Sequence, residues 1–167
     1  MKYTDTQITF SEFPDEISLC INISNCPWHC PGCHSPELWE DVGTELTFEE
    51  LDRLIKSNEG ITCVGFMGGD YNTPYLNELA KYIVNNIDSD LNIGWYSGNS
   101  RLSDYIDTTL FDYIKLGPYD KELGGLDNPN TNQRMYQYSP YFSDCNTELG
   151  IGWRDITYKF WKHGSNN

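Results

Sequence analysis

The sequence has few basic residues and no long apolar run. Its 167 residues include 11 lysines and arginines against 25 aspartates and glutamates, for a formal net charge of -14. Binding to a phosphate backbone needs clustered cations, because counterion release drives it, so we expect no nucleic-acid partner. No apolar run approaches the roughly 18 residues of a membrane span, and residues 1–10 lack the basic-then-apolar layout of a secretory signal. We therefore expect a cytoplasmic protein with no membrane partner.

Cysteine is also scarce, and half of it lies in one short stretch. Of the six cysteines, Cys26, Cys30 and Cys33 fall within eight residues, in the run Cys26-Pro-Trp-His-Cys-Pro-Gly-Cys-His34. In a reducing compartment, clustered cysteines are more often metal ligands or redox groups than disulfides. The two prolines pre-set the turn, and Gly32 lets the backbone wrap an inorganic core. The sequence therefore predicts a metal or redox centre in this loop.

Four kinds of centre fit three thiols in one loop. A 4Fe-4S cluster held by Cys26, Cys30 and Cys33 would leave one iron open to an exogenous ligand. A Cys3His zinc site could recruit His29 or His34 as its fourth ligand. The segment from Cys30 to His34 also matches the attachment motif of c-type haem. The same segment contains a dithiol of the thioredoxin kind. Zinc sites usually draw paired ligands from distant segments, haem attachment is expected in exported proteins, and a dithiol gives Cys26 no role. We therefore favour the cluster.

The rest of the chain alternates strand-like and helix-like segments. Thr47 and Glu50 form a capping box in front of a helical pattern. Thr73 is expected to cap a longer helix, with Pro74 at its first position. Strands alternating with helices indicate βαβ units around a parallel sheet. We expect strands at 7–10, 16–23, 60–66, 91–96, 113–116 and 155–161, and helices at 48–56, 73–87 and 102–110.

These units predict an α/β fold. The chain is too short for an eight-stranded barrel of about 250 residues, so we expect an open partial (β/α) barrel. Residues 1–167 should form a single domain, with a loop-rich part from about residue 117. The cysteine loop directly follows the strand at 16–23, so the thiols should lie at a strand's carboxyl end, where α/β folds build their sites.

The other cysteines carry less information. Apolar residues alternate along 16–23, which indicates that one face is buried, and Cys20 lies on the opposite face as a strand residue. Cys63 is expected in the core, and Cys145 has no assigned role.

A second motif follows the next strand, at Gly68-Gly69-Asp70. A C-x3-C-x2-C loop after the first barrel strand, with Gly-Gly-acid after the next, resembles the radical S-adenosylmethionine superfamily. The resemblance extends from about Ile17 to Trp161. Within the superfamily, the chain resembles the activating proteins of anaerobic ribonucleoside-triphosphate reductases in Cys30-Pro-Gly-Cys33, 112–119, 123–126, 132–134 and 153–161.

This resemblance implies an oxidoreductase with a 4Fe-4S cluster and S-adenosylmethionine as cofactors. In the family, one electron from the cluster cleaves the sulfonium to methionine and a 5'-deoxyadenosyl radical, which takes a hydrogen from a glycine Cα of the reductase. The implied partners are the catalytic subunit of that anaerobic reductase and a low-potential electron donor such as flavodoxin or ferredoxin. No side chain is expected to be catalytic beyond the cluster and its ligand.

The resemblance also implies roles for single residues. Cys26, Cys30 and Cys33 match the cluster ligands. Gly68 and Gly69 match glycines whose backbone approaches the methionine moiety, although a plain strand-to-helix turn would also need them.

Four further residues match positions of the ligand pocket. Asp70 stands where the superfamily usually has a glutamate that holds the ligand's amino group. His34 matches a position near the adenine, Lys115 a lysine that pairs the carboxylate, and Ser97 a strand-end pocket residue. A surface histidine and an outward-facing lysine are the ordinary alternatives. Asn132, Gln133 and Arg134 match a family pattern, for which we expect a structural role in satisfying loop carbonyls at least as readily as partner contact.

Two rival functions remain open at this point. A radical enzyme of the same superfamily could act on a small molecule of the deazapurine type. A zinc-stabilised binding module without catalysis would use the cysteine loop alone.

Overall fold

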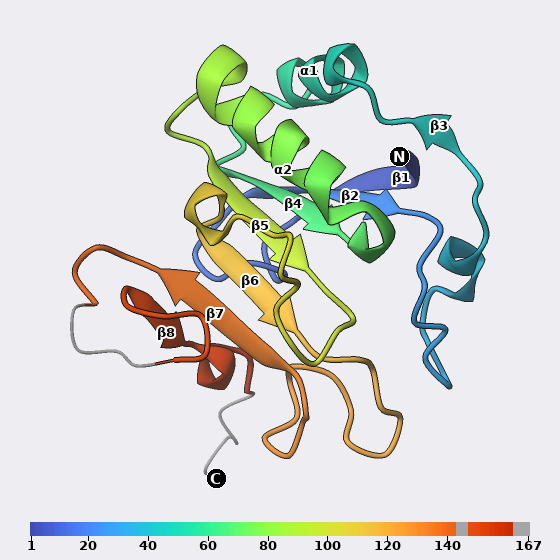
Figure 1. Cartoon of the computed structure of the whole chain (residues 1–167), viewed down its shortest axis with the longest axis vertical. Coiled ribbons are helices and arrows are strands. Elements are labelled where there is room, and N and C mark those ends of the chain that lie inside the picture. The colour runs from blue at the N-terminus through green and yellow to red at the C-terminus, as the bar shows by residue number, and fades with distance from the viewer. Residues whose placement is uncertain (143–146, 162–167) are drawn as a thin grey trace, which may run out of the picture.

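The computed structural model describes residues 1–142 and 147–161, so Cys145 lies outside the described residues. These residues form a mixed sheet of eight strands in the order β3-β1-β2-β4-β5-β6-β7-β8 (Figure 1). Strands β2, β4, β5 and β6 are parallel, and antiparallel strands flank them on both sides. The strands are β1 Lys2–Thr9, β2 Ser18–Ile23, β3 Thr44–Glu45, β4 Cys63–Met67, β5 Asn92–Tyr96, β6 Tyr113–Leu116, β7 Arg134–Tyr138 and β8 Trp153–Asp155.

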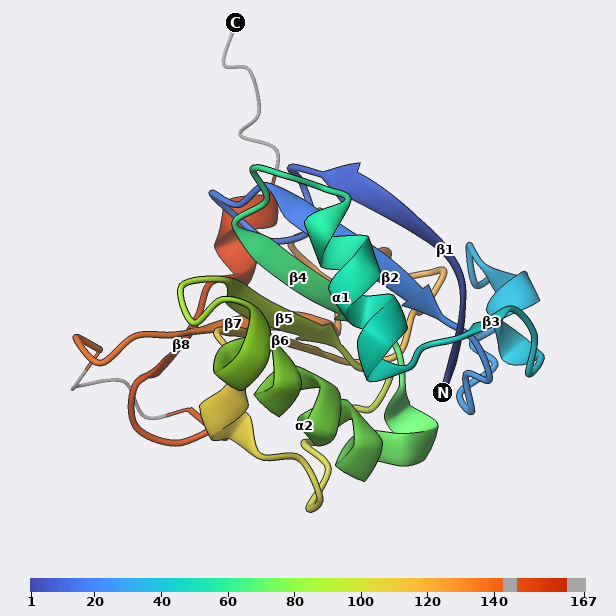
Figure 2. The same cartoon turned by 90° about the horizontal axis from the view of Figure 1, so that it is seen from above.

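Two α-helices of the described residues cover one face of the sheet (Figure 2). Helix α1, Phe48–Lys56, begins as its capping box predicts, because the Glu50 N–H donates to the Thr47 side chain at 3.2 Å. Helix α2, Thr73–Tyr82, is instead capped by Asn72 and continues as a π-helical turn over Ile83–Ile87. None of the helices in the described residues is long and apolar enough to cross a membrane.

The expected open partial (β/α) barrel is wrong. Among the described residues an α-helix follows only β2 and β4 of the four parallel strands. The expected helix at 102–110 is a single 3-10 turn, Thr108–Leu110. Here Ser103 and Asp107 accept hydrogen bonds from backbone N–H groups two residues later, which offers the chain a local alternative to a helix. Beyond β6 the sheet continues with the antiparallel strands β7 and β8, so it is mixed.

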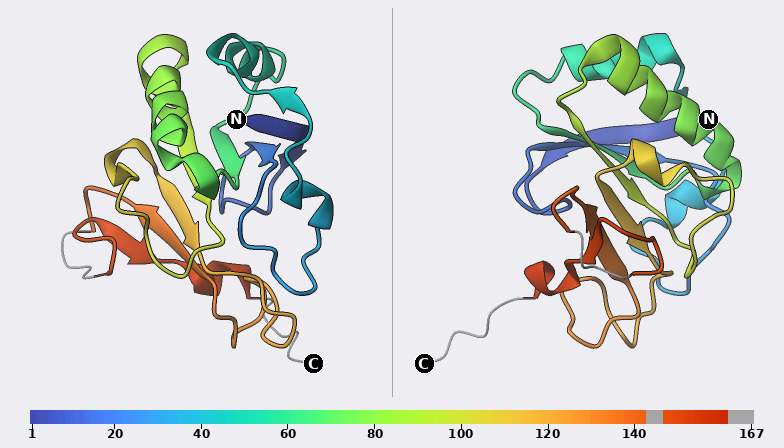
Figure 3. Two further views of the ribbon diagram at one scale, coloured as in Figure 1. Left: turned by 45° about the vertical axis from the view of Figure 1, so that its right-hand side comes forward. Right: turned by 60° about the vertical axis from the view of Figure 1, so that its left-hand side comes forward.

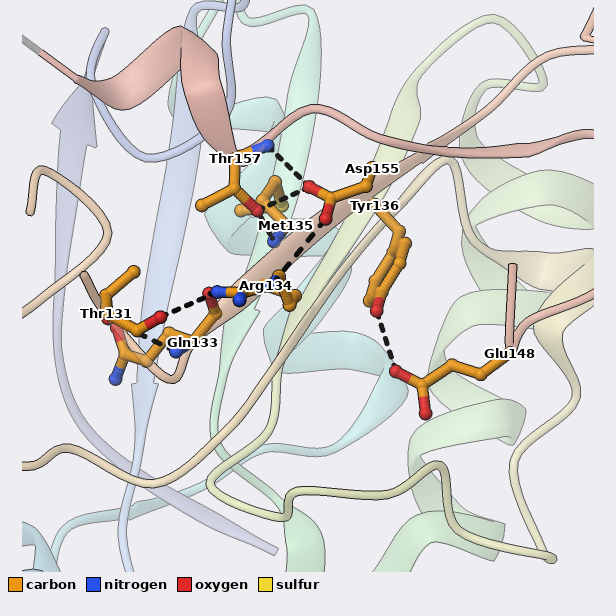
Figure 4. A network of polar contacts seen from close by, with 8 residues as sticks. All are labelled: Thr131, Gln133, Arg134, Met135, Tyr136, Glu148, Asp155 and Thr157. Carbon is orange, nitrogen blue, oxygen red and sulfur yellow. Dashed lines mark hydrogen bonds and ion pairs between the residues drawn. The ribbon is translucent and has the colours of Figure 1, made fainter. Parts of the chain in front are cut away.

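The C-terminal part also differs from the prediction. The expected loop from residue 117 contains β7, and the expected strand at 155–161 is the short β8 followed by a 3-10 turn, Thr157–Phe160. Figure 4 shows what joins them: Arg134 donates to the carbonyls of Thr131 and Gln133 at 2.7 Å each, and its Nε lies 3.7 Å from Asp155 Oδ2. Arg134 therefore satisfies loop carbonyls, as its structural interpretation predicted.

Both faces of the sheet are buried, although the alternation of apolar residues along β2 predicted a single buried face. Between sheet and helices lies the larger core, which includes Ile21, Phe66 and Trp95. The opposite face carries a second cluster that contains Cys20 and Cys63, both 0% exposed. Burial raises the pKa of Cys20 to about 12. Cys63 is a core residue, as predicted, whereas Cys20 was expected as a strand residue on the face opposite the buried one and is also in the core.

Phe13 fixes the loop between β1 and β2 on this second face. Its ring lies where Gly65 and Gly94 of neighbouring strands have no side chain, and a Cβ on Gly94 would come within 2.1 Å of it. The ring also meets Tyr96 edge-on, with centroids 5.3 Å apart. The loop over residues 10–15 is thereby held across the sheet, where it forms one wall of the cleft described below.

We predict that Phe13→Ala lowers the free energy of unfolding by about 3–5 kcal/mol, because it empties a fully buried aromatic site. Phe10 lies in the same loop and is 70% exposed. Phe10→Ala is the matched control and should stay within about 0.5 kcal/mol of wild type. Urea unfolding followed by circular dichroism measures both, and equal effects would show that Phe13 does not anchor the loop.

Candidate metal centre and its cleft

Except for Lys115, which lies in β6, the predicted site residues lie in loops that leave one edge of the sheet. The cysteine loop follows β2, Gly68 to Asp70 follow β4, and Ser97 follows β5. Because these strands are parallel, their carboxyl ends lie at the same edge. The loop after β6 approaches the cysteine loop at this end of the molecule (Figure 3). The fold therefore gathers segments that are distant in the sequence.

Backbone hydrogen bonds close the cysteine loop at its base. The Cys26 N–H donates to the Leu38 carbonyl at 2.9 Å. Within the loop, His29 and Gly32 have positive φ values of 45° and 75°, which the tight path of the chain requires. The His29 ring stacks on Trp39 with centroids 4.9 Å apart. The loop is therefore a compact unit with its own internal contacts.

The three thiols are each partly buried in this loop. The Cys33 N–H donates to the Cys30 carbonyl at 3.0 Å, and Cys33 Sγ accepts the Ser35 N–H at 3.4 Å. Burial raises the pKa of the Cys26 thiol, while nearby backbone N–H groups oppose that rise. N–H donors directed at sulfur stabilise thiolates and tune iron-sulfur centres. The donor set of Cys26, Cys30 and Cys33 thus fits a 4Fe-4S cluster.

The thiols do not converge on one point. Within the described residues, no three or more His, Cys, Asp or Glu side chains are arranged to hold a single metal ion. In a 4Fe-4S cluster each cysteine binds a separate iron, so its ligands surround a polynuclear core.

A cleft of about 1010 Å³ lies on the sheet face opposite the helices. Its lining includes Cys33 and His34 of the cysteine loop, residues of the loop over 10–15 and residues 158–160. Its floor includes Tyr96 and Lys115, which are neighbours in the register of β5 and β6. The volume is at the upper end of the range for small-molecule sites, roughly 300–1,000 Å³.

Lys115 faces this cleft from β6, so it does not point to the outer face. Its side chain donates to the carbonyls of Gly117 at 2.6 Å and Ser97 at 3.4 Å. Among the described residues no carboxylate lies within 4.0 Å of Nζ. Burial lowers the pKa of Lys115 to about 8, against the attraction of Asp70, Cys30 and Cys26. A buried ammonium beside two thiols, open to a cleft, is suited to an anionic ligand.

The acid of the second motif is bound within the protein. Asp70 accepts the Ser97 hydroxyl at 2.5 Å and the Gly98 N–H at 3.3 Å. Gly68 and Gly69 have φ values of 111° and 93°, so they supply the turn after β4. The position of a Cβ on Gly69 would face the helix-side core. These residues lie beside the cleft, whereas Cys33, His34 and Lys115 line it.

The loop after β6 covers the cysteine loop. The His34 ring lies 4.6 Å from that of Tyr119, and a Cβ on Gly32 would come within 3.3 Å of Lys121. Sequence reasoning missed Tyr96 and Tyr119. It gave Gln133 no site role, yet this side chain lines the cleft, is 6% exposed and has no hydrogen-bond partner for its amide in the described part of the chain. For Tyr96, the available signal was its position at the end of a predicted strand, next to Ser97. For Gln133, it was the Asn-Gln-Arg pattern.

A protein-family model described as a 4Fe-4S single cluster domain matches residues 17–115, more than half of the chain. The matched region begins just before β2 and ends at Lys115, so it includes the whole cysteine loop. Searches of curated proteins and of solved structures gave no significant match.

We predict that the stability difference between wild type and Lys115→Met depends on pH. Below about pH 8, Lys115 is charged in both the folded and the unfolded protein, so the folded protein carries the full free-energy cost of burying this charge. Between pH 8 and its ordinary value of 10.5, the folded protein loses a proton that the unfolded chain keeps, so the cost shrinks. Wild type should therefore gain about 3 kcal/mol relative to the variant across this window.

Urea unfolding of both proteins at several pH values measures this difference. Lys81→Met, at an exposed lysine of α2, is the control. If the stability difference between wild type and Lys115→Met did not depend on pH, burial would not lower the pKa of Lys115.

Proposed function

Because the chain belongs to the family of 4Fe-4S single cluster domains, we propose that Cys26, Cys30 and Cys33 hold such a cluster and that the protein uses it to cleave S-adenosylmethionine reductively. Clusters of this type are commonly held by four thiolates. A loop that supplies three leaves one iron for an exogenous ligand. The observation that carries the proposal is that this loop lines a cleft that also holds a buried lysine.

When bound, the cluster supplies the electron that splits the sulfonium of S-adenosylmethionine into methionine and a 5'-deoxyadenosyl radical. The protein's own groups bind and orient the ligand. The Lys115 ammonium pairs with the ligand's carboxylate, since its two carbonyl partners leave one N–H free for the cleft. His34 and Tyr119 offer an aromatic wall for the adenine beside Cys33.

The target of the radical is, in this proposal, a glycine Cα in the catalytic subunit of an anaerobic ribonucleoside-triphosphate reductase. Support comes from the motifs at 112–119 and 132–134, which resemble the activating proteins of those reductases. The cleft of about 1010 Å³ is also lined by the loop over 10–15, and this volume leaves room for a segment of a protein partner next to the cofactor. The electron comes from a low-potential donor such as flavodoxin or ferredoxin.

We predict that Cys26→Ala, Cys30→Ala and Cys33→Ala each abolish cluster assembly, because each removes one thiolate ligand. Anaerobic reconstitution followed by iron and sulfide analysis measures the loss. Cys63→Ala is the control, since that thiol is fully buried in the second core and should retain the brown cluster. A colourless wild-type protein with one tightly held zinc ion would instead support the binding module.

Activity is tested with S-adenosylmethionine, a chemical reductant and the purified reductase. Wild type should yield methionine and 5'-deoxyadenosine, and electron paramagnetic resonance should show a glycyl doublet on the reductase. Lys115→Met should keep the cluster but bind S-adenosylmethionine roughly 10- to 100-fold more weakly, because it loses a charged hydrogen bond. Cleavage without a glycyl signal would favour a small-molecule substrate.

A further inference from the structure

Trp28 connects the cysteine loop to the ends of β4 and β5. Its ring is 39% exposed and lies against Gly98, where a Cβ would come within 2.3 Å of the indole Cδ1. Gly98 does not have the positive φ that would itself demand glycine. The missing side chain at Gly98 therefore serves the close approach of the indole.

The Trp28 side chain also interacts with Asp70. The carboxylate accepts hydrogen bonds from the Ser97 hydroxyl and from the Gly98 N–H. Burial raises the pKa of Asp70, and these two donors together with the nearby Trp28 side chain oppose the rise. The carboxylate thus joins the turn after β4 to the turn after β5, against which the indole of the cysteine loop packs.

Trp28 also lies close to a predicted cluster ligand, two residues after Cys26 in the cysteine loop. Its indole packs on Gly98, whose backbone N–H donates to Asp70. The Asp70 carboxylate is thereby held beside the cysteine loop, and movement of Trp28 would move that part of the loop as well.

We propose that Asp70, Gly98 and Trp28 form a bracket that fixes the cysteine loop on the strand ends and holds a negative charge beside that loop. Asp70 is then a positioning residue, because its carboxylate is occupied by donors of the chain. The bracket rests on the cluster assignment of the proposed function but not on cleavage of S-adenosylmethionine.

Amide hydrogen exchange of the cluster-free protein tests the bracket directly. Gly98→Ala keeps every hydrogen-bonding group but displaces the indole, and Trp28→Phe keeps a ring but removes its N–H. Both should raise exchange in residues 26–34 several-fold while leaving α1 and α2 unchanged, as expected for local opening. Exchange in 26–34 equal to wild type in both variants would overturn the proposal.

Matched controls are present in the chain. Trp39→Phe removes an indole N–H that has no partner among the described residues and keeps an aromatic ring to stack on His29. Gly125→Ala adds a Cβ that meets its nearest neighbour at an ordinary 3.5 Å. Neither should change exchange in residues 26–34, and an increase in both would mean that any disturbance loosens the loop.

The cluster-loaded protein gives a second readout. Gly98→Ala and Trp28→Phe should release iron to a chelator roughly tenfold faster, the lower end of the loss seen for residues that support metal ligands. Asp70→Asn should shift the reduction potential to more positive values, because a negative charge beside the cluster disfavours the reduced form. An unchanged or more negative potential would contradict the role of Asp70.

These outcomes are separable from the proposed function. If wild type assembles no cluster, the proposed function fails while the exchange experiment still decides the bracket. If wild type cleaves S-adenosylmethionine but exchange is the same in all variants, the bracket fails alone.

Discussion

The site depends on the register of four parallel strands. Asn22 of β2 pairs with Met67 of β4, Met67 with Tyr96 of β5, and Tyr96 with Lys115 of β6. This row brings the carboxyl ends of the strands to one level, so the following loops all begin at the same edge. Because a slip of one residue would turn every side chain to the opposite face, it would remove Lys115 from the cleft. The register is thus a functional constraint as well as a packing one.

The sequence was most informative where chemistry or capping is local. Three cysteines at fixed spacing predicted the metal loop, and the capping box at Thr47 predicted α1. Strand β6 was predicted with its observed ends, since its short apolar run is bounded by turn residues. In each case a few adjacent residues determine the structure, so no knowledge of the tertiary fold was needed.

The predictions failed where contacts between residues distant in the sequence determine the structure. Strand β7 lies in a segment rich in glycine, asparagine and proline, and it is a strand because it pairs with β6 opposite Lys115. The expected helix at 102–110 has suitable apolar spacing, but local side-chain bonds of Ser103 and Asp107 prevail. The partners of Asp70 lie at least 27 residues away along the chain. Motif spacing therefore singled out Asp70 but could not give its contacts.

The bracket and the lysine complement each other. Asp70 is the leading source of attraction for Lys115, yet its oxygens are bound to Ser97 and Gly98, so the two charges do not form a direct ion pair. Had Asp70 closed onto Lys115, the ammonium would be neutralised within the protein. Because the carboxylate is committed elsewhere, Lys115 keeps a donor for an anion that enters the cleft. The attachment of the cysteine loop and the proposed binding of a carboxylate by Lys115 thus both depend on how one acidic side chain is bonded.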